Sequence, residues 1–189
     1  MDLPLNLTRS VLTILIPGAV ASAPWLLWAL IEIDPTGNYY EKYAFPIHVL
    51  SFVVAVVVGS IINTLVSYIE LAWDNSQGSK DAPKIGDSWL EKDWYAYLSS
   101  AFGETEPVGY RYLSHLVSAL YFELGMIGAV PIGVLAVAVF LMHHNHCAWA
   151  VASVVAAAAF GALFYKTAQH THLVLCKTRR EILRPPNVE

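Results

Sequence analysis

The sequence predicts an all-α integral membrane protein: a bundle of four transmembrane helices, with a short amphipathic helix in the loop between the second and third spans. Of its 189 residues, 56% are hydrophobic and 14% are charged, whereas roughly a quarter of the residues in a soluble domain are charged. The apolar residues form four long runs, 11–33, 44–73, 112–142 and 147–172. Each run exceeds the roughly 20 residues that a helix needs to cross a bilayer. Helices are favoured over a barrel because a helix satisfies its backbone hydrogen bonds within one segment. The whole chain is therefore predicted to be one transmembrane domain.

The first run is predicted to be a retained span rather than a cleaved signal peptide. Small residues at 21–23 offer a cleavage site, but Arg9 is the one basic residue before the run, and Pro24 and Trp28 continue the apolar stretch beyond it. Pro17 and Pro24 also predict an interrupted helix, because a proline inside a helix removes a backbone hydrogen bond.

The second run carries one amide, Asn63, four residues after Gly59. A small residue and an amide at this spacing share a helix face, where the amide can bond to a closely packed neighbour. We favour this packing role over the alternative, in which Asn63 lines a polar path.

The distribution of basic residues predicts the orientation, because Lys and Arg near the ends of spans stay in the cytoplasm. Nine of them lie before residue 11, within 74–111 or after residue 172, whereas Lys42 stands alone in the segment 34–43. Both termini (N-in, C-in) and the insert 74–111 are therefore predicted to be cytoplasmic. The expected location is a bacterial-type inner (plasma) membrane, which the chain crosses several times.

The insert 74–111 divides into two parts. Residues 74–86 are polar and rich in turn-forming residues, so we predict a loop there. Ser88 and Glu91 then match a helix capping box. The apolar side chains that follow recur at helical spacing and are mostly aromatic: Leu90, Trp94, Tyr97, Leu98 and Phe102. Such a helix lies in the membrane interface or docks a cytoplasmic protein partner, and both readings stay open.

The tail 173–189 is predicted to prolong the fourth helix as far as Pro185. It carries a basic cluster, Lys177, Arg179, Arg180 and Arg184. Each of these charges gains about 1 kcal/mol beside anionic lipid headgroups. The cluster is chiefly a topology signal, and a partner site there is the alternative.

Ionisable residues inside a span are costly and therefore candidates for function. Glu123 lies 22 residues before Asn145, at the centre of the short turn between the last two spans, and Lys166 lies 21 residues after it. The two residues thus reach almost the same depth in an antiparallel hairpin, which predicts a salt bridge that fixes the register. A proton or ion relay through Glu123, Lys166, Asn63 and His115 is one alternative, and no contact at all is another.

The histidines raise two cofactor hypotheses, although no cofactor is the favoured prediction. A membrane four-helix bundle can hold haem between two His ligands, but His115 and His170 differ in depth by five residues, or about 7 to 8 Å of helix rise. His172 reduces this mismatch to three residues. The turn HHNHC supplies four candidate ligands for Zn or Cu, which are His143, His144, His146 and Cys147. Solvated side chains are the favoured reading of this turn, since adjacent residues in a tight turn rarely converge on one ion.

The sequence contains no nucleophile elbow, P-loop, dinucleotide-binding or metalloprotease motif, and no nucleic-acid signature. We therefore expect no enzyme activity. Small residues at four-residue spacing, Gly125 with Ala129 and Ala157 with Gly161, predict close helix packing. The favoured function is a non-enzymatic membrane scaffold that contacts lipids, forms a homo-oligomer or joins other membrane subunits, and recruits a cytoplasmic partner. The alternatives are an oligomeric channel or membrane-perturbing effector, as in a stress or phage-defence system, and a haem-binding redox subunit.

Overall fold

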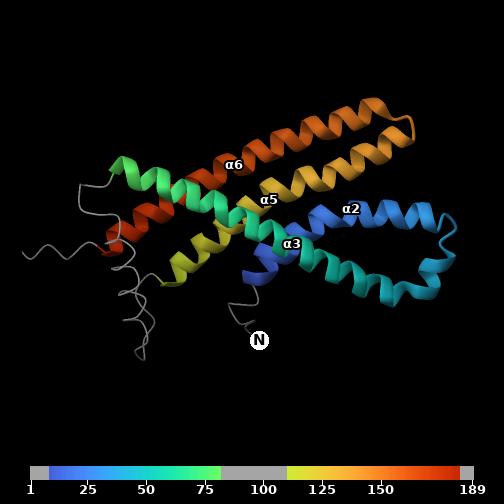
Figure 1. Ribbon diagram of the computed structural model, residues 1–189, viewed down its shortest axis with the longest axis horizontal. Coiled ribbons are helices and arrows are strands. Elements are labelled where there is room, and N and C mark those ends of the chain that lie inside the picture. The colour runs from blue at the N-terminus through green and yellow to red at the C-terminus, as the bar shows by residue number, and fades with distance from the viewer. Residues whose placement is uncertain (1–8, 82–109, 184–189) are drawn as a thin grey trace, which may run out of the picture.

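The computed structural model describes residues 9–81 and 110–183, and the side chains of residues 9–73 and 112–178. These residues form a π-helical turn and four α-helices: η1 (Val11–Leu15), α2 (Ile16–Ile33), α3 (Asn38–Asp81), α5 (Tyr110–His143) and α6 (Cys147–Leu183) (Figure 1). Four stretches are long and apolar enough to cross a membrane: Val11–Ile33, Asn38–Trp73, Tyr112–His143 and Cys147–Thr178. The prediction of an all-α chain with four such helices is confirmed for the described residues.

The boundaries of α3 differ from those that the sequence predicted. The helix continues through Asp81, so residues 74–81, which were predicted to begin a loop, are helical. The one breaker within them is Gly78, which costs a helix only about 1 kcal/mol. The first proline after the span is Pro83, and a proline disfavours helical backbone in the residue before it. Residues 74–81 therefore contain no proline that would interrupt the helix.

The helices form two antiparallel hairpins, α2 with α3 and α5 with α6, whose connections lie at the same end of the molecule (Figure 1). We call this end, which holds residues 34–37 and 144–146, the turn end. Each connection contains one residue with left-handed backbone, Gly37 with φ of 75° and Asn145 with φ of 62°. Glycine and asparagine are the residues that adopt this conformation at least cost, which allows both turns to be very short.

The two hairpins meet through α2, which packs against both α3 and α5. A Cβ atom at Gly18 of α2 would overlap the backbone carbonyl of Ala55, and one at Gly59 of α3 would overlap that of Ile14. On the other side of α2, a Cβ atom at Gly133 of α5 would overlap the carbonyl of Val20. These glycines therefore let three helix backbones touch, which is how small residues pack helices in a membrane.

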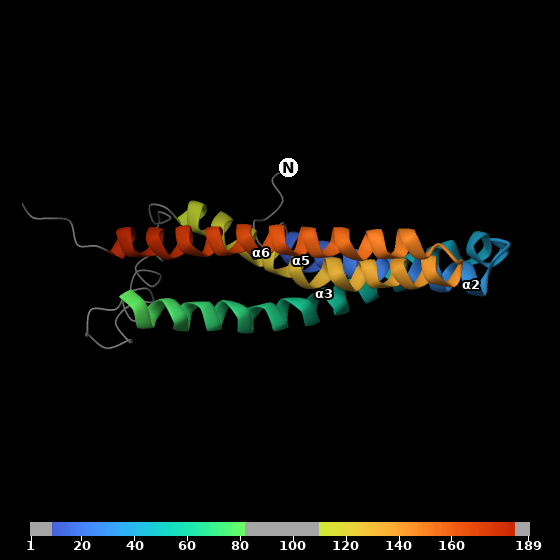
Figure 2. The same ribbon diagram turned by 90° about the horizontal axis from the view of Figure 1, so that it is seen from above.

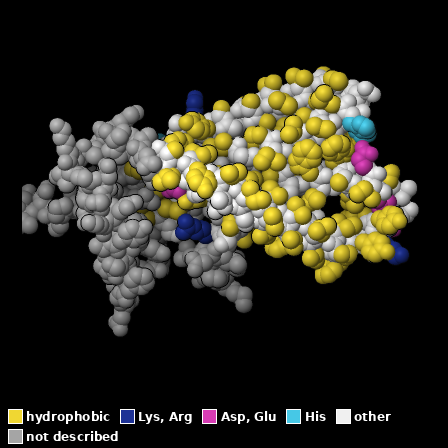
Figure 3. Space-filling view, viewed as in Figure 1, with side chains coloured by type: hydrophobic (Ala, Val, Ile, Leu, Met, Phe, Trp, Pro, Cys, Tyr) yellow, Lys and Arg dark blue, Asp and Glu magenta, His cyan; other side chains and the backbone are white. Residues whose placement is uncertain are grey.

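The α2/α3 contact agrees with the predicted use of Gly59, and α5 supplies the largest share of the buried core. Its buried apolar residues are Leu113, Leu120, Leu124 and Ala129, and they join Ala21, Ile62, Val66, Ala168 and Leu175 of the other helices in one cluster. Around this core, hydrophobic side chains cover most of the visible surface of the described helices, and charged ones gather toward the ends (Figure 3). Such a surface suits lipid contact.

Helix α6 contacts the rest of the chain along a narrow stripe that faces α5. The buried residues of this stripe are Ala150, Ala157, Ala168 and Leu175. At the end away from the turns, α3 and α6 run apart (Figure 2), and Trp73 of α3 bridges them. Its ring lies 5.6 Å from that of Tyr165 and 5.5 Å from that of His172, in edge-on arrangements.

Candidate functional site

Glu123 lies on α5 with its carboxyl group against α6. Its Oε2 atom is buried and has no hydrogen-bond partner. Thr171 and His170 of α6 lie near enough to the carboxyl group to act on it electrostatically. A buried carboxylate oxygen without a partner costs about 1 to 3 kcal/mol or more. Burying Glu123 therefore costs free energy, because polar neighbours compensate only part of its carboxyl group.

The expected salt bridge between Glu123 and Lys166 is not formed. Lys166 is exposed on α6, and the groups that act on the carboxyl of Glu123 are Thr171 and His170. Side chains of a helix lean toward its N-terminus. On α5 this direction leads away from the turn at Asn145, so Glu123 reaches residues of α6 further from the turn than the count along the backbone suggests.

The other two residues of the predicted polar path lie elsewhere. Asn63 is half-buried on α3 and His115 is exposed near the start of α5. Within the described part of the chain, the structure records no hydrogen bond from either side chain to Glu123. The four residues of the predicted path therefore do not form one connected set.

The histidine-rich turn is exposed throughout, from His143 to Cys147. His143 Nε2 lies 3.8 Å from Glu32 Oε1, at the end of α2, while the ring of His144 packs edge-on against Phe140, 4.5 Å between centroids. The described residues contain no group of three His, Cys, Asp or Glu side chains that could hold a metal ion. The side chains of this turn thus point to different neighbours rather than to a shared centre.

The histidines considered for haem have unlike surroundings. His115 and His170 are exposed, whereas His172 is only 3% exposed and packs against Trp73. The thiol of Cys176 lies 3.8 Å from His172 Nε2, one helical turn away. His172 therefore belongs to an aromatic and thiol cluster at the α3/α6 contact.

Several predicted residues lie outside the described part. The apolar face of the amphipathic helix, Leu90, Trp94, Tyr97, Leu98 and Phe102, falls within 82–109, and Arg184 follows residue 183. Lys177 is exposed on α6, and Arg179 and Arg180 lie on the same helix. The predicted prolongation of the fourth helix into the tail is therefore confirmed as far as Leu183, whereas the amphipathic helix and the roles of the insert and the basic cluster stay predictions.

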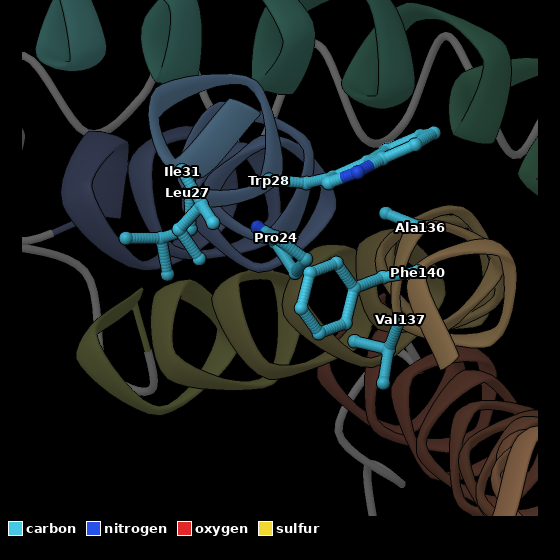
Figure 4. A pocket seen from close by; sticks show the side chains of 7 residues that line it. All are labelled: Pro24, Leu27, Trp28, Ile31, Ala136, Val137 and Phe140. Carbon is cyan, nitrogen blue, oxygen red and sulfur yellow. The ribbon is translucent and has the colours of Figure 1, made fainter. Parts of the chain in front are cut away.

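A groove at the turn end was not foreseen from the sequence. It lies between α2 and α5 and is lined entirely by apolar residues: Pro24, Leu27, Trp28, Ile31, Ala136, Val137 and Phe140 (Figure 4). The four residues from α2 recur at helical spacing, which was visible in the sequence. Their partners on α5 were not, because they depend on how the two helices cross.

The position of the groove follows from the way in which α2 and α5 pack. Gly133 touches the backbone of α2 at Val20, and the indole N–H of Trp25 donates a hydrogen bond of 3.0 Å to the carbonyl of Ile132. Beyond these contacts the two hairpins diverge toward the turn end (Figure 1). Pro24 in α2 and Pro131 in α5 lie beside this point, and prolines commonly bend helices.

In comparisons with known proteins, no family model matches the chain, and no curated protein or solved structure is similar to it.

Proposed function

We propose that the chain is a non-enzymatic membrane subunit that self-associates or joins a larger membrane complex through α6, and recruits a cytoplasmic partner through the insert 74–111 and the basic tail. Both termini lie in the cytoplasm in this proposal, as the distribution of basic residues favours. The supporting observation is the exposed apolar surface of α6.

The face of α6 opposite α5 is apolar and exposed, and alanines recur on it among larger residues such as Val155 and Leu163. Its alanines are Ala148, Ala152, Ala156 and Ala159, all exposed, and three of them recur at intervals of four residues. Small residues at this spacing allow a second helix to approach closely. This face therefore suits a helix of another chain.

Assembly tests the proposal through the double variant Ala152→Ile and Ala156→Ile. The full chain is purified in mild detergent and the particle mass is measured with all co-purifying proteins. The wild type should give a mass well above that of one 20.8 kDa chain, either as several copies or with partner proteins. The double variant should give the mass of one chain, because branched side chains prevent close approach of helix backbones.

The matched control is Ala29→Ile, on an exposed position of α2. It introduces the same side chain and should leave the particle mass unchanged. The proposal fails if the wild type is already a single chain without partners. It also fails if the control disrupts the assembly as strongly as the double variant.

A second candidate function, an ion-conducting channel or membrane-perturbing effector, is favoured by Glu123. An unpartnered carboxylate oxygen inside a span is costly, and such residues are often retained because a polar path needs them. In this proposal Glu123 faces a water-filled path in the assembled protein.

Ion flux from liposomes that contain the purified chain separates the two functions. A channel predicts flux that Glu123→Gln reduces, whereas the scaffold predicts no flux in either protein. Glu32→Gln is the control, because Glu32 is exposed at the turn end. Flux that both variants reduce equally would argue against a path at Glu123.

A further inference from the structure

We propose that the groove between α2 and α5 binds one acyl chain of a phospholipid whose headgroup carries a primary ammonium, with the headgroup held at Glu32, His143 and His144. This lipid site does not depend on the scaffold function proposed above. It rests on the shape and lining of the groove and on the polar groups at its mouth.

The lining of the groove suits an acyl chain. All seven residues are apolar, and on α2 they extend from Pro24 to Ile31, which is about 10 Å of helix rise. In Figure 4 the Pro24 and Phe140 side chains lie between the two helices, with Leu27 and Ile31 on one side of α2 and Trp28 on the other. A gap between diverging helices in hydrocarbon must be filled, because empty space forfeits the dispersion contacts of its lining. The hydrocarbon around the protein supplies a filling of the right shape.

A second helix fits this groove less well than an acyl chain. Helices in membranes approach each other through small residues, and the groove offers one of these, Ala136, which is fully buried. Its rim carries bulky side chains instead, with Leu27 and Ile31 at least half exposed. A flexible chain of methylenes can fit among such side chains, whereas a helix of about 10 Å diameter would be held away by them.

The mouth of the groove is polar and lies one helical turn beyond its lining. The indole N–H of Trp28, which lines the groove, donates a hydrogen bond of 3.2 Å to Glu32 Oε1. His143 Nε2 lies 3.8 Å from the same oxygen. Both neighbours approach through Oε1, and the Glu32 side chain is 49% exposed. The carboxylate can therefore accept a hydrogen bond from a further donor outside the protein.

The two charges of the proposed headgroup match this mouth. Glu32 supplies a carboxylate for a primary ammonium, which has three N–H donors. His143 and His144, whose rings are 5.4 Å apart, supply ring N–H groups for a phosphate. The ring of His144 packs edge-on against Phe140, which lines the groove. Figure 3 shows a histidine beside an acidic side chain at this end of the molecule. An anionic headgroup without an ammonium would meet the Glu32 carboxylate unfavourably.

The test measures lipid binding to the full-length chain, purified in detergent and stripped of lipid, by native mass spectrometry. Phosphatidylethanolamine and phosphatidylglycerol with identical acyl chains are added separately. The wild type should bind one phosphatidylethanolamine more tightly than phosphatidylglycerol. Val137→Trp, which fills the groove, should weaken binding of both lipids by about fivefold, since most of the packing contacts are lost.

Two further variants complete the experiment. Val57→Trp places the same ring on an exposed position of α3 and should bind both lipids as the wild type does. Glu32→Gln should keep the acyl-chain site but bind the two headgroups equally. Helicity and elution volume are compared for all variants, and Ile31→Trp replaces Val137→Trp if the latter does not fold.

Three results would overturn the inference. Equal binding to the Val137→Trp and Val57→Trp variants would show that lipid binds elsewhere. A dimer that Val137→Trp dissociates would show that a second copy of the chain occupies the groove. A preference for phosphatidylethanolamine that survives Glu32→Gln would show that the carboxylate does not select the headgroup.

Discussion

The contacts of α2 with α3 and α5 differ sharply from the surroundings of α6. Around α2, glycines lie directly against neighbouring backbones: Gly18, Gly59 and Gly133 have no room for a Cβ atom. On α6, Gly161 has nothing within 4 Å of such an atom, and most side chains outside the stripe that faces α5 are exposed. Glycine thus marks a tight backbone contact around α2, whereas at Gly161 there is open space although Ala157 and Ala168, on the same helix face, are buried against α5. The described helices are therefore packed most tightly around α2, and α6 is the helix that the rest of the chain covers least.

The largest expected effect is a loss of stability at the tight helix contacts around α2. Gly18→Ala should lower the free energy of unfolding by about 2 kcal/mol or more, because the added Cβ atom meets backbone, which cannot move aside cheaply. Denaturant titration in mixed micelles, followed by helicity, measures the change. Gly161→Ala should leave the single chain as stable as the wild type. Equal losses in the two variants would contradict the comparison.

The next effect concerns the unpartnered oxygen of Glu123, at the contact between α5 and α6. Glu123→Met should raise the free energy of unfolding by about 1 kcal/mol, since an apolar group of similar length removes the cost of a buried acceptor. The same titration measures it, with Lys166→Met as the control for a charged residue exposed on α6. A loss of several kcal/mol in the Glu123 variant would instead reveal a strong partner for the carboxyl group.

A smaller effect is expected at the point where α2 and α5 begin to diverge. Trp25→Phe removes the hydrogen bond to the carbonyl of Ile132 and should cost about 0.6 kcal/mol, the average for a hydrogen bond between membrane helices. The control is Trp149→Phe on α6, where the ring is 70% exposed and the change should be within error. If both variants behave alike, Trp25 does not hold α2 to α5.

The smallest effect is the pH dependence of the α2–α3 turn. Burial raises the pKa of Asp34, but hydrogen bonds from the backbone N–H groups of Tyr40, Tyr39 and Asn38 and from the Thr36 hydroxyl outweigh it, so the pKa is lowered below the ordinary 3.8. A lowered pKa contributes stability that is complete above 3.8 and lost as the pH falls through the folded value. Thermal unfolding of wild type and Asp34→Asn should therefore differ at neutral pH and converge in acid. A difference that persists at low pH would contradict this sign.

Much of the fold could be predicted because membrane spans are defined by length and apolarity alone. The first span, residues 11–33, coincides with Val11–Ile33 in the structure. The end of α3 was not predicted, because the polar residues 74–81 contain turn formers that a helix nevertheless tolerates. Orientation, the amphipathic helix and oligomer formation stay predictions, since they depend on a membrane, on residues 82–109 or on other chains.

The candidate site was only partly predictable. The sequence identified Glu123 as costly, but assigned it to Lys166 by counting residues from the turn, and that count ignored the lean of side chains along a helix. The groove and its mouth depend on the crossing of α2 and α5, which bring Trp28, Glu32 and His143 together from distant parts of the sequence. No local sequence pattern indicates that these three residues come together.

The short connections at the turn end also bear on how the chain is made. With only residues 144–146 between them, α5 and α6 are too closely tied to enter a membrane independently, so they insert as one helical hairpin. The same holds for α2 and α3. We therefore expect two stages of assembly, the insertion of each hairpin and their later docking where Gly133 of α5 meets Val20 of α2, with packing rather than exclusion from water as the driving force. Until docking is complete, the face of α5 around Gly133 would be open to the surrounding lipid.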